Sequence, residues 1–268
     1  MSHRPRKRFG QHFLAPAWAD KVVDAIAPAR DDRFIEIGPG PGILTTRLAA
    51  RAAHVTAIEV DRDLAAALAP RVPRNVEILT HDVIHVDLSP LLAAGPVRVA
   101  GNLPYNISSP ILFKLLAASR SSPNLRDATV MLQREVADRL AARVGTKEYG
   151  VLTILVGLQA TVERRLVLPP GAFRPAPKVH SAVVRLTFKP SILPPDLEPL
   201  FDRMVKTMFM QRRKTLLNAL RPFADAQQRT SGAILAAAGI DPQRRPETLA
   251  TEELLRLVQV VQIGRAHV

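Results

Sequence analysis

The twenty residues from Arg33 to Ala52, RFIEIGPGPGILTTRLAARA, decide which fold this chain can adopt. They open with a short apolar segment, which is typical of a buried β-strand. Gly38, Gly40 and Gly42 then alternate with two prolines, and the apolar spacing that follows indicates a helix. A strand, a glycine-rich turn and a helix in this order form the first part of a β-α-β unit.

The same alternation continues along the chain. Apolar strands are predicted at residues 54–61, 75–82, 97–102 and 128–133, and helices at 62–72 and 109–119. A later pair of strands, 161–169 and 180–190, is separated by a proline-rich loop. Strands separated by helices of this length predict an α/β fold with a mainly parallel sheet and right-handed crossovers.

The pattern changes after residue 190, where a proline-rich linker, SILPPDLEP, begins. The residues beyond it have helical apolar spacing. We therefore predict an α/β domain over 1–190 and a small all-helical domain over 191–262. The last six residues, IGRAHV (263–268), break the helical pattern and match what a common sequencing adapter encodes, so we interpret them as a non-native tail.

Charge points to a polyanionic partner. The formal net charge is +13 on 268 residues, and 47% of the residues are hydrophobic, which fits a globular protein. Nucleic acid is the partner that this charge favours. The basic residues gather near the N-terminus and in a later zone: Arg4, Arg6, Lys7 and Arg8; Arg203, Lys206, Arg212, Arg213, Lys214, Arg221, Arg229, Arg244 and Arg245.

Several protein classes do not fit the composition. There is no Cys, which excludes a disulfide framework and thiolate chemistry. No apolar run reaches about 18 residues, so no membrane span is expected. The basic N-terminus lacks the apolar core of a secretory signal. A cytoplasmic protein is the resulting expectation.

The glycine loop predicts a cofactor site. Glu59 ends the second strand, 21 residues after Gly38, where nucleotide-binding folds place an acid that accepts hydrogen bonds from ribose hydroxyls. A dinucleotide site favours G-x-G-x-x-G, whereas this loop reads G-x-G-x-G. Glu36, beside the loop, would repel phosphate and favours a cationic ligand with an amino group. S-adenosylmethionine fits, and no metal is implied; the alternatives are a nicotinamide dinucleotide and a plain tight turn.

Asp82 closes the third predicted strand. A carboxylate there can accept a hydrogen bond from the adenine amino group of the cofactor, although Asp at a strand end is also a common helix cap.

The fourth strand ends in Asn102-Leu103-Pro104-Tyr105, at the same edge of the sheet as the cofactor loop. An exocyclic adenine amine is a poor nucleophile because its lone pair is delocalised into the ring. The Asn102 side-chain oxygen and the Leu103 carbonyl can accept hydrogen bonds from it, while Pro104 fixes the backbone. Tyr105 can stack on the base. The alternative is a strand-terminating turn with a half-buried Tyr.

These motifs occur together in one known family. RKRFGQHFL (6–14), EIGPGPGILT (36–45), AGNLPYNISSPILFKLL (100–116), FRPAPKVHSAVVRL (173–186) and FMQRRKTLLNAL (209–220) appear in its order and at its spacings. The chain resembles, over nearly its whole length, the small-subunit ribosomal RNA adenine N6,N6-dimethyltransferases of the KsgA/RsmA type. The resemblance implies a Rossmann-like methyltransferase domain with a mostly parallel seven-stranded sheet, followed by a small helical domain.

The resemblance also implies residue roles. Cofactor contacts fall on His12, Leu14, Gly38, Glu59, Asp82 and Asn102, with Asn102, Leu103, Pro104 and Tyr105 in catalysis. His12 departs from the family's usual Asn. Phe173 would sandwich the extruded adenine against Tyr105. Arg212, Arg213 and Lys214 would contact the rRNA backbone.

The implied activity is dimethylation, from S-adenosylmethionine, of two adjacent adenosines in the 3′-terminal hairpin of small-subunit rRNA. The implied partner is that rRNA or the 30S precursor particle, with a role in ribosome biogenesis and a monomeric protein as the default. Three alternatives stay open: a methyltransferase that modifies one large-subunit adenosine and confers macrolide resistance, a ribosome assembly factor without turnover, and a dinucleotide oxidoreductase.

Overall fold

The computed structural model describes residues 11–263. The chain forms two compact units: the first runs to Ala137 and resumes over Ala160–Lys189, and the second comprises Asp138–Gln159 and the residues from Pro190 on. The break at residue 190 lies where the linker was expected. The division differs from the predicted 1–190 and 191–262 in the segment Asp138–Gln159, whose Tyr149 and Ile154 are buried in the core of the second unit.

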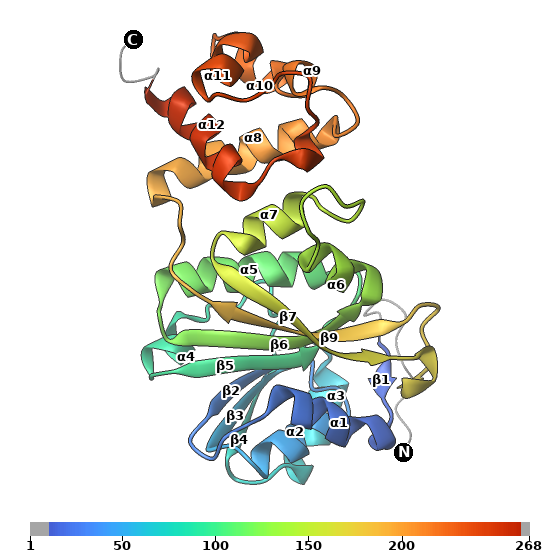
Figure 1. Cartoon of the computed structure of the whole chain (residues 1–268). Coiled ribbons are helices and arrows are strands. Elements are labelled where there is room, and N and C mark those ends of the chain that lie inside the picture. Colours follow the sequence, from blue (N-terminus) through green and yellow to red (C-terminus); the bar gives the residue numbers. More distant parts are fainter. Residues whose placement is uncertain (1–10, 264–268) are drawn as a thin grey trace. The chain divides into compact units, whose positions relative to one another are not determined.

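The first unit contains a mostly parallel seven-stranded sheet, as expected, in the order β4-β3-β2-β5-β6-β9-β7 (Figure 1). The first five strands in this order, β4, β3, β2, β5 and β6, pair in parallel. Strand β9 is antiparallel to both β6 and β7. A separate two-stranded ribbon joins β1 to β8. The strands are β1 (Phe13–Leu14), β2 (Arg33–Ile37), β3 (His54–Ile58), β4 (Val76–Leu79), β5 (Val97–Asn102), β6 (Leu125–Gln133), β7 (Ala160–Leu168), β8 (Phe173–Arg174) and β9 (Ser181–Phe188).

Helices cover both faces of this sheet (Figure 1). Apolar side chains of α1 and α2 join those of the strands in one buried cluster, while α5 lies on the opposite face. The helices up to the start of the second unit are α1 (Pro16–Ile26), α2 (Ile43–Ala49), α3 (Arg62–Leu68), α4 (Ser89–Ala93), α5 (Ser108–Ser121) and α6 (Arg134–Leu140). The sequence pattern had not predicted α1 or the short helices α4 and α6.

A close approach of two central strands brings their ends together. Ile37 of β2 is the register partner of Gly101 of β5, and a Cβ at Gly101 would lie 2.4 Å from the Ile37 carbonyl oxygen. Only glycine fits there without moving the backbone. The next residues, Gly38 and Asn102, are consequently neighbours: a Cβ built on Gly38 would lie 3.8 Å from the Asn102 carbonyl oxygen. The cofactor loop and the Asn102 turn therefore share one edge of the sheet.

The carboxyl end of α1 is fixed to the sheet by a buried ion-pair cluster. Arg98 of β5 pairs with Asp32 at 2.6 Å and with Asp127 at 2.8 Å, and it donates to the Ile26 and Ala27 carbonyls. Removing one member would leave an unpaired buried charge, so the cluster stabilises the contact between the end of α1 and β5.

The second unit is helical around its own apolar core. Its helices are α7 (Val151–Gly157), α8 (Glu198–Met210), α9 (Leu216–Ala219), α10 (Arg221–Asp225), α11 (Ser231–Ala237) and α12 (Thr251–Ile263). Ile263, which the sequence reading assigned to the tail, is the last residue of α12. Residues 264–268 and the basic residues Arg4, Arg6, Lys7 and Arg8 lie outside the described range. Within 11–263, no helix is long and apolar enough to cross a membrane.

Candidate active site

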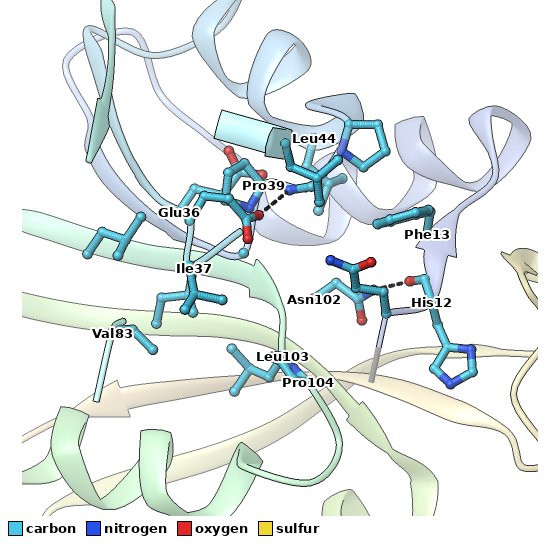
Figure 2. A pocket seen from close by; sticks show the side chains of 18 of the residues that line it. His12, Phe13, Glu36, Ile37, Pro39, Leu44, Val83, Asn102, Leu103 and Pro104 are labelled. Carbon is cyan, nitrogen blue, oxygen red and sulfur yellow. Dashed lines mark hydrogen bonds between the residues drawn. The ribbon is translucent and has the colours of Figure 1, made fainter. Parts of the chain in front are cut away.

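One cavity opens at the carboxyl ends of β2 to β5, where ligands of open α/β sheets bind (Figure 2). Its lining brings together nine residues singled out from the sequence: His12, Leu14, Gly38, Glu59, Asp82, Asn102, Leu103, Pro104 and Tyr105. Phe173 is not among the lining residues, and Arg212, Arg213 and Lys214 belong to the second unit. Residues 11–14, which precede α1 and which we call the arm, all line the cavity and form one of its walls.

The glycine loop has a backbone shape that other residues would resist. Gly38, Gly40 and Gly42 all have positive φ, and Gly42 is the residue before α2. At Gly42 a Cβ would also lie 2.2 Å from a methyl carbon of Leu68. The left-handed conformation favours glycine there, and any side chain would also displace the Leu68 side chain of α3.

Glu59 holds the loop from the neighbouring strand. Its carboxylate accepts hydrogen bonds from the Gly40 amide at 2.9 Å and from the Asp61 amide at 2.9 Å. Burial raises the pKa of Glu59, although these two backbone donors act in the opposite direction. Each carboxylate oxygen has a second lone pair, so the group can also accept from ligand hydroxyls, as predicted for a ribose.

Glu36 is a buried acid in the same cavity, with 1% of its surface exposed. Its Oε2 has no hydrogen-bond partner among the described residues. Burial raises its pKa to about 7, and the nearby charge of Glu59 adds to the effect. A cation with N–H donors would relieve this situation, whereas a phosphate would worsen it. The cavity therefore fits S-adenosylmethionine better than a dinucleotide, as the sequence predicted.

Asp82 lies at the outer part of the cavity, and 41% of its side chain is exposed. Its Oδ1 accepts from the Ile84 amide at 2.9 Å, and its main-chain carbonyl accepts from the His85 amide. Asp82 therefore caps the turn after β4, and its second carboxylate oxygen, Oδ2, lies 4.0 Å from His85 Nε2 at the exposed side of the cavity. Both roles considered from the sequence are compatible with this geometry.

The Asn102 amide is held in one orientation (Figure 2). Its Nδ2 donates to the His12 carbonyl oxygen at 2.7 Å. A carbonyl only accepts, so this bond identifies the NH₂ group and leaves Oδ1 on the other side. Oδ1 is buried, has no partner among residues 11–263, and belongs to a residue that lines the cavity. An unpaired buried acceptor is costly unless a ligand supplies a donor.

Tyr105 is fixed at its hydroxyl, which shares a hydrogen bond with Ser181 Oγ at 2.5 Å. Burial raises the pKa of Tyr105, so the phenol stays neutral at physiological pH. The His12 ring stacks on it with the ring centroids 5.4 Å apart and the planes at 24°. Ser181 was not predicted, because the residues of this contact are 76 positions apart and no local pattern marks it.

Phe173 does not occupy the predicted place. Its side chain is 0% exposed and packs in the apolar cluster of the first unit, and in the β1–β8 ribbon Phe173 is the register partner of Leu14. Truncating a buried Phe to Ala in such a core costs about 3–5 kcal/mol. Phe173 therefore lies behind Leu14, which lines the cavity, and its predicted stacking on a base stays a prediction.

The three basic residues predicted to contact the rRNA backbone differ from one another in their contacts. Arg212 donates from Nε and from Nη2 to Glu247 Oε2, at 2.9 and 2.8 Å, and from Nη1 to the Lys147 carbonyl. Arg213 and Lys214 are exposed in the turn between α8 and α9. The turn precedes α9, which begins at Leu216. Arg213 and Lys214 are therefore better placed than Arg212 to contact an RNA backbone.

Two further observations concern metal binding and the position of the arm. Within the described part of the chain, no three His, Asp or Glu side chains are grouped so as to hold a metal ion. Gln11 Nε2 donates to Asp61 Oδ2 at 3.2 Å, which ties the arm to the start of α3.

Comparison with known proteins gives a consistent result. The family model described as ribosomal RNA adenine dimethylase matches residues 2–262. A ribosomal RNA small subunit methyltransferase A from Syntrophotalea carbinolica is 44% identical, covering 98% of each chain. A protein of the same name from Acidithiobacillus ferrooxidans is 42% identical over 96% of this chain and 94% of its own length.

Two solved structures share the architecture of both units. A dimethyladenosine transferase from Plasmodium falciparum has a TM-score of 0.79 at 26% identity and covers 96% of this chain and 99% of its own. The 23S rRNA methyltransferase ErmE has a TM-score of 0.68 at 26% identity and covers 93% of this chain and 99% of its own.

Proposed function

Because this chain belongs to the ribosomal RNA adenine dimethylase family, we propose that it dimethylates N6 of two adjacent adenosines in the 3′-terminal hairpin of small-subunit (16S) rRNA. S-adenosylmethionine is the methyl donor, and the reaction is a step in small-subunit biogenesis. The observation that carries this proposal is the Asn102 amide. Its Nδ2 is bonded to the arm, and its buried Oδ1 is unpaired in a cavity that begins at the glycine loop.

The cavity residues divide between cofactor and base. Glu59 and Asp82 provide acceptors for ribose hydroxyls and an adenine amino group, and Glu36 provides a buried negative charge. When bound, S-adenosylmethionine supplies a sulfonium-linked methyl group that is transferred to the target nitrogen. The loop glycines let the backbone approach such a ligand without a Cβ between them.

Asn102 Oδ1 and the Leu103 carbonyl accept hydrogen bonds from the target amine. These bonds keep electron density on the nitrogen and hold its lone pair toward the donor site, so that orientation provides much of the rate. The nitrogen becomes cationic when it takes the methyl group, and its proton is then acidic enough to leave without a strong base. Tyr105, neutral and fixed by Ser181, is a stacking surface for the extruded base.

The form of the substrate follows from charge. The +13 charge and the exposed pair Arg213 and Lys214 suit an rRNA backbone, and a 30S precursor particle is the form we propose. We further propose that the enzyme acts as a monomer in the cytoplasm, where its substrate is assembled.

The decisive experiment is to map the products. The purified chain would be incubated with methyl-labelled S-adenosylmethionine and either small-subunit particles from a strain lacking the modification or naked large-subunit rRNA. We expect label in two adjacent adenosines of the small-subunit hairpin, identified by mass spectrometry of RNA fragments. Label in large-subunit rRNA alone would favour the resistance-type alternative, and no label in either RNA would favour an assembly factor without turnover.

A further inference from the structure

The arm is attached at both of its ends. At its carboxyl end, β1 pairs with β8 and leads into α1. At its other end, where the described part of the chain begins, Gln11 Nε2 donates to Asp61 Oδ2 at 3.2 Å. All four arm residues line the cavity, so a molecule that fills the cavity lies against the arm. The two attachments therefore determine whether the arm stays in place beside such a ligand.

Asp61 is a rigid attachment point for Gln11. It is 1% exposed, and its Oδ1 caps α3 by accepting from the Asp63 amide at 3.1 Å. Its own main-chain amide donates to one carboxylate oxygen of Glu59 at 2.9 Å, and the other oxygen of Glu59 accepts from Gly40. A carboxylate only accepts hydrogen bonds, so the Gln11 amide turns its NH₂ group toward Asp61. This bond joins the arm to the network that holds Glu59 and the glycine loop.

Phe13 brings the arm against the glycine loop. A Cβ built on Gly40 would lie 3.2 and 3.3 Å from two ring carbons of Phe13, so the ring rests directly on the glycine. An apolar contact of this kind is not directional and does not by itself fix the position of the arm. The hydrogen bond from Gln11 to Asp61 is directional, and it fixes the arm to the start of α3.

We propose that Gln11 is a positioning residue for the cofactor, and that its hydrogen bond to Asp61 controls how fast S-adenosylmethionine leaves the cavity. The inference rests on the proposed function, since it takes S-adenosylmethionine as the ligand of this cavity. The ligand leaves when the arm has moved away from α3, so the release rate follows the fraction of molecules in which the bond is broken. A variant that lacks the bond has a larger fraction in this open form and releases the ligand faster.

The test is a double-mutant cycle on the full-length protein with Gln11→Ala, Asp61→Ser and the two combined. Ser retains the cap of α3, but its single oxygen is used there and is not available to Gln11. Protein loaded with methyl-labelled S-adenosylmethionine, without RNA, would be mixed with excess unlabelled cofactor, and the retained label followed by rapid filtration. We expect each single variant to release the label about tenfold faster, as for the loss of a hydrogen bond to a charged group. The combined variant should be no faster than either, because both changes remove the same bond.

Two further variants sharpen the test. Gln11→Glu at pH 8 places a second carboxylate against Asp61, and it should release the label faster than Gln11→Ala. This variant also tests the proposal if Asp61→Ser does not fold. Gln243→Ala changes an exposed glutamine of the second unit and should release the label at the wild-type rate.

Other results would overturn the proposal. Faster release in Gln11→Ala but not in Asp61→Ser, or slower release in Gln11→Glu, would mean that Gln11 contacts the cofactor directly. Faster release in Asp61→Ser alone would assign the effect to Glu59 or to α3, and unchanged release in every variant would leave the bond without a role. Wild-type protein that retains no labelled cofactor would instead refute the proposed function. Thermal unfolding of each variant identifies a folding defect.

Discussion

On the cofactor side of the cavity the partners are near neighbours in sequence, since Gly40 and Glu59 are 19 residues apart. On the target side they are distant: Asn102 is held by His12 across 90 residues, and Tyr105 by Ser181 across 76. The cofactor side is built within one β-α-β unit, whose geometry is fixed by the crossover itself. The target side exists only after the arm and β9 have docked on the sheet.

Substitutions on the two sides of the cavity should therefore have different effects. A change on the cofactor side acts on a unit that already has its shape, so it alters ligand affinity and local stability. A change on the target side removes a group whose orientation depends on the arm, so it alters the rate of transfer. The following experiments test this distinction, in order of decreasing expected effect.

The largest effect is expected for Asn102→Ala. The variant lacks the acceptor aimed at the target amine, and single-turnover methylation of small-subunit particles should slow by about 10²–10³-fold, as for the loss of other preorganised catalytic hydrogen bonds. RNA binding, measured by filter retention, provides the control and should change far less than the rate. If methylation proceeds at the wild-type rate, the proposed role of Asn102 is wrong.

Gly101→Ala would disturb the contact between β2, which leads into the cofactor loop, and β5, which ends at Asn102. The new methyl group meets the Ile37 carbonyl at 2.4 Å, so β2 and β5 must separate, and we expect a loss of about 3 kcal/mol in the free energy of unfolding. The matched control is Gly171→Ala, where a Cβ meets nothing within 4 Å. Urea denaturation of both variants provides the measurement, and equal stability of the two would contradict the close approach of the strands.

Glu36→Gln tests the buried acid of the cofactor side. The pKa of Glu36 is about 7 in the folded protein and 4.5 as a free group, so its favourable contribution is complete below pH 4.5 and is lost as pH rises through 7. That loss amounts to roughly 3 kcal/mol. Without ligand, Glu36→Gln should therefore be more stable than the wild type at pH 8 and similar at pH 4.5, as measured by chemical denaturation.

Glu36→Gln should bind S-adenosylmethionine more weakly at pH 8, because the cation loses its buried counter-charge. The same substitution at Glu77, an exposed residue of β4, is the control and should change neither quantity. A variant that loses stability at pH 8 would contradict the raised pKa.

The smallest effects are expected for substitutions of the consecutive basic residues Arg212, Arg213 and Lys214. Replacing Arg213 and Lys214 by Ala should weaken rRNA binding and reduce the slope of log K against log salt by roughly 1–2, as expected for one or two lost phosphate contacts. Arg212→Ala should instead cost about 1 kcal/mol of stability, because it breaks the ion pair with Glu247. Fluorescence titrations at several salt concentrations separate the two results. A larger slope change for Arg212 would place that residue in the interface.

Several parts of the molecule could be predicted from the sequence. The period of the apolar residues located the central strands and three helices of the first unit, and the glycine loop with Glu59 and Asn102 identified the edge at which the cavity lies. The assignment of Asp138–Gln159 to the second unit could not be predicted, because α7 carries an ordinary apolar face whose partner, α8, begins 41 residues after α7 ends.

The sequence by itself determined the fold class and nine of the residues that line the cavity, because strand period, loop glycines and strand-end acids act over a few residues. Only the tertiary structure decided that Phe173 is buried, that His12 faces Tyr105 and that Arg212 is paired with Glu247. These outcomes depend on which distant segments pack together. Burial and pairing are properties of contacts between segments, and no local pattern specifies a contact across 90 residues of chain.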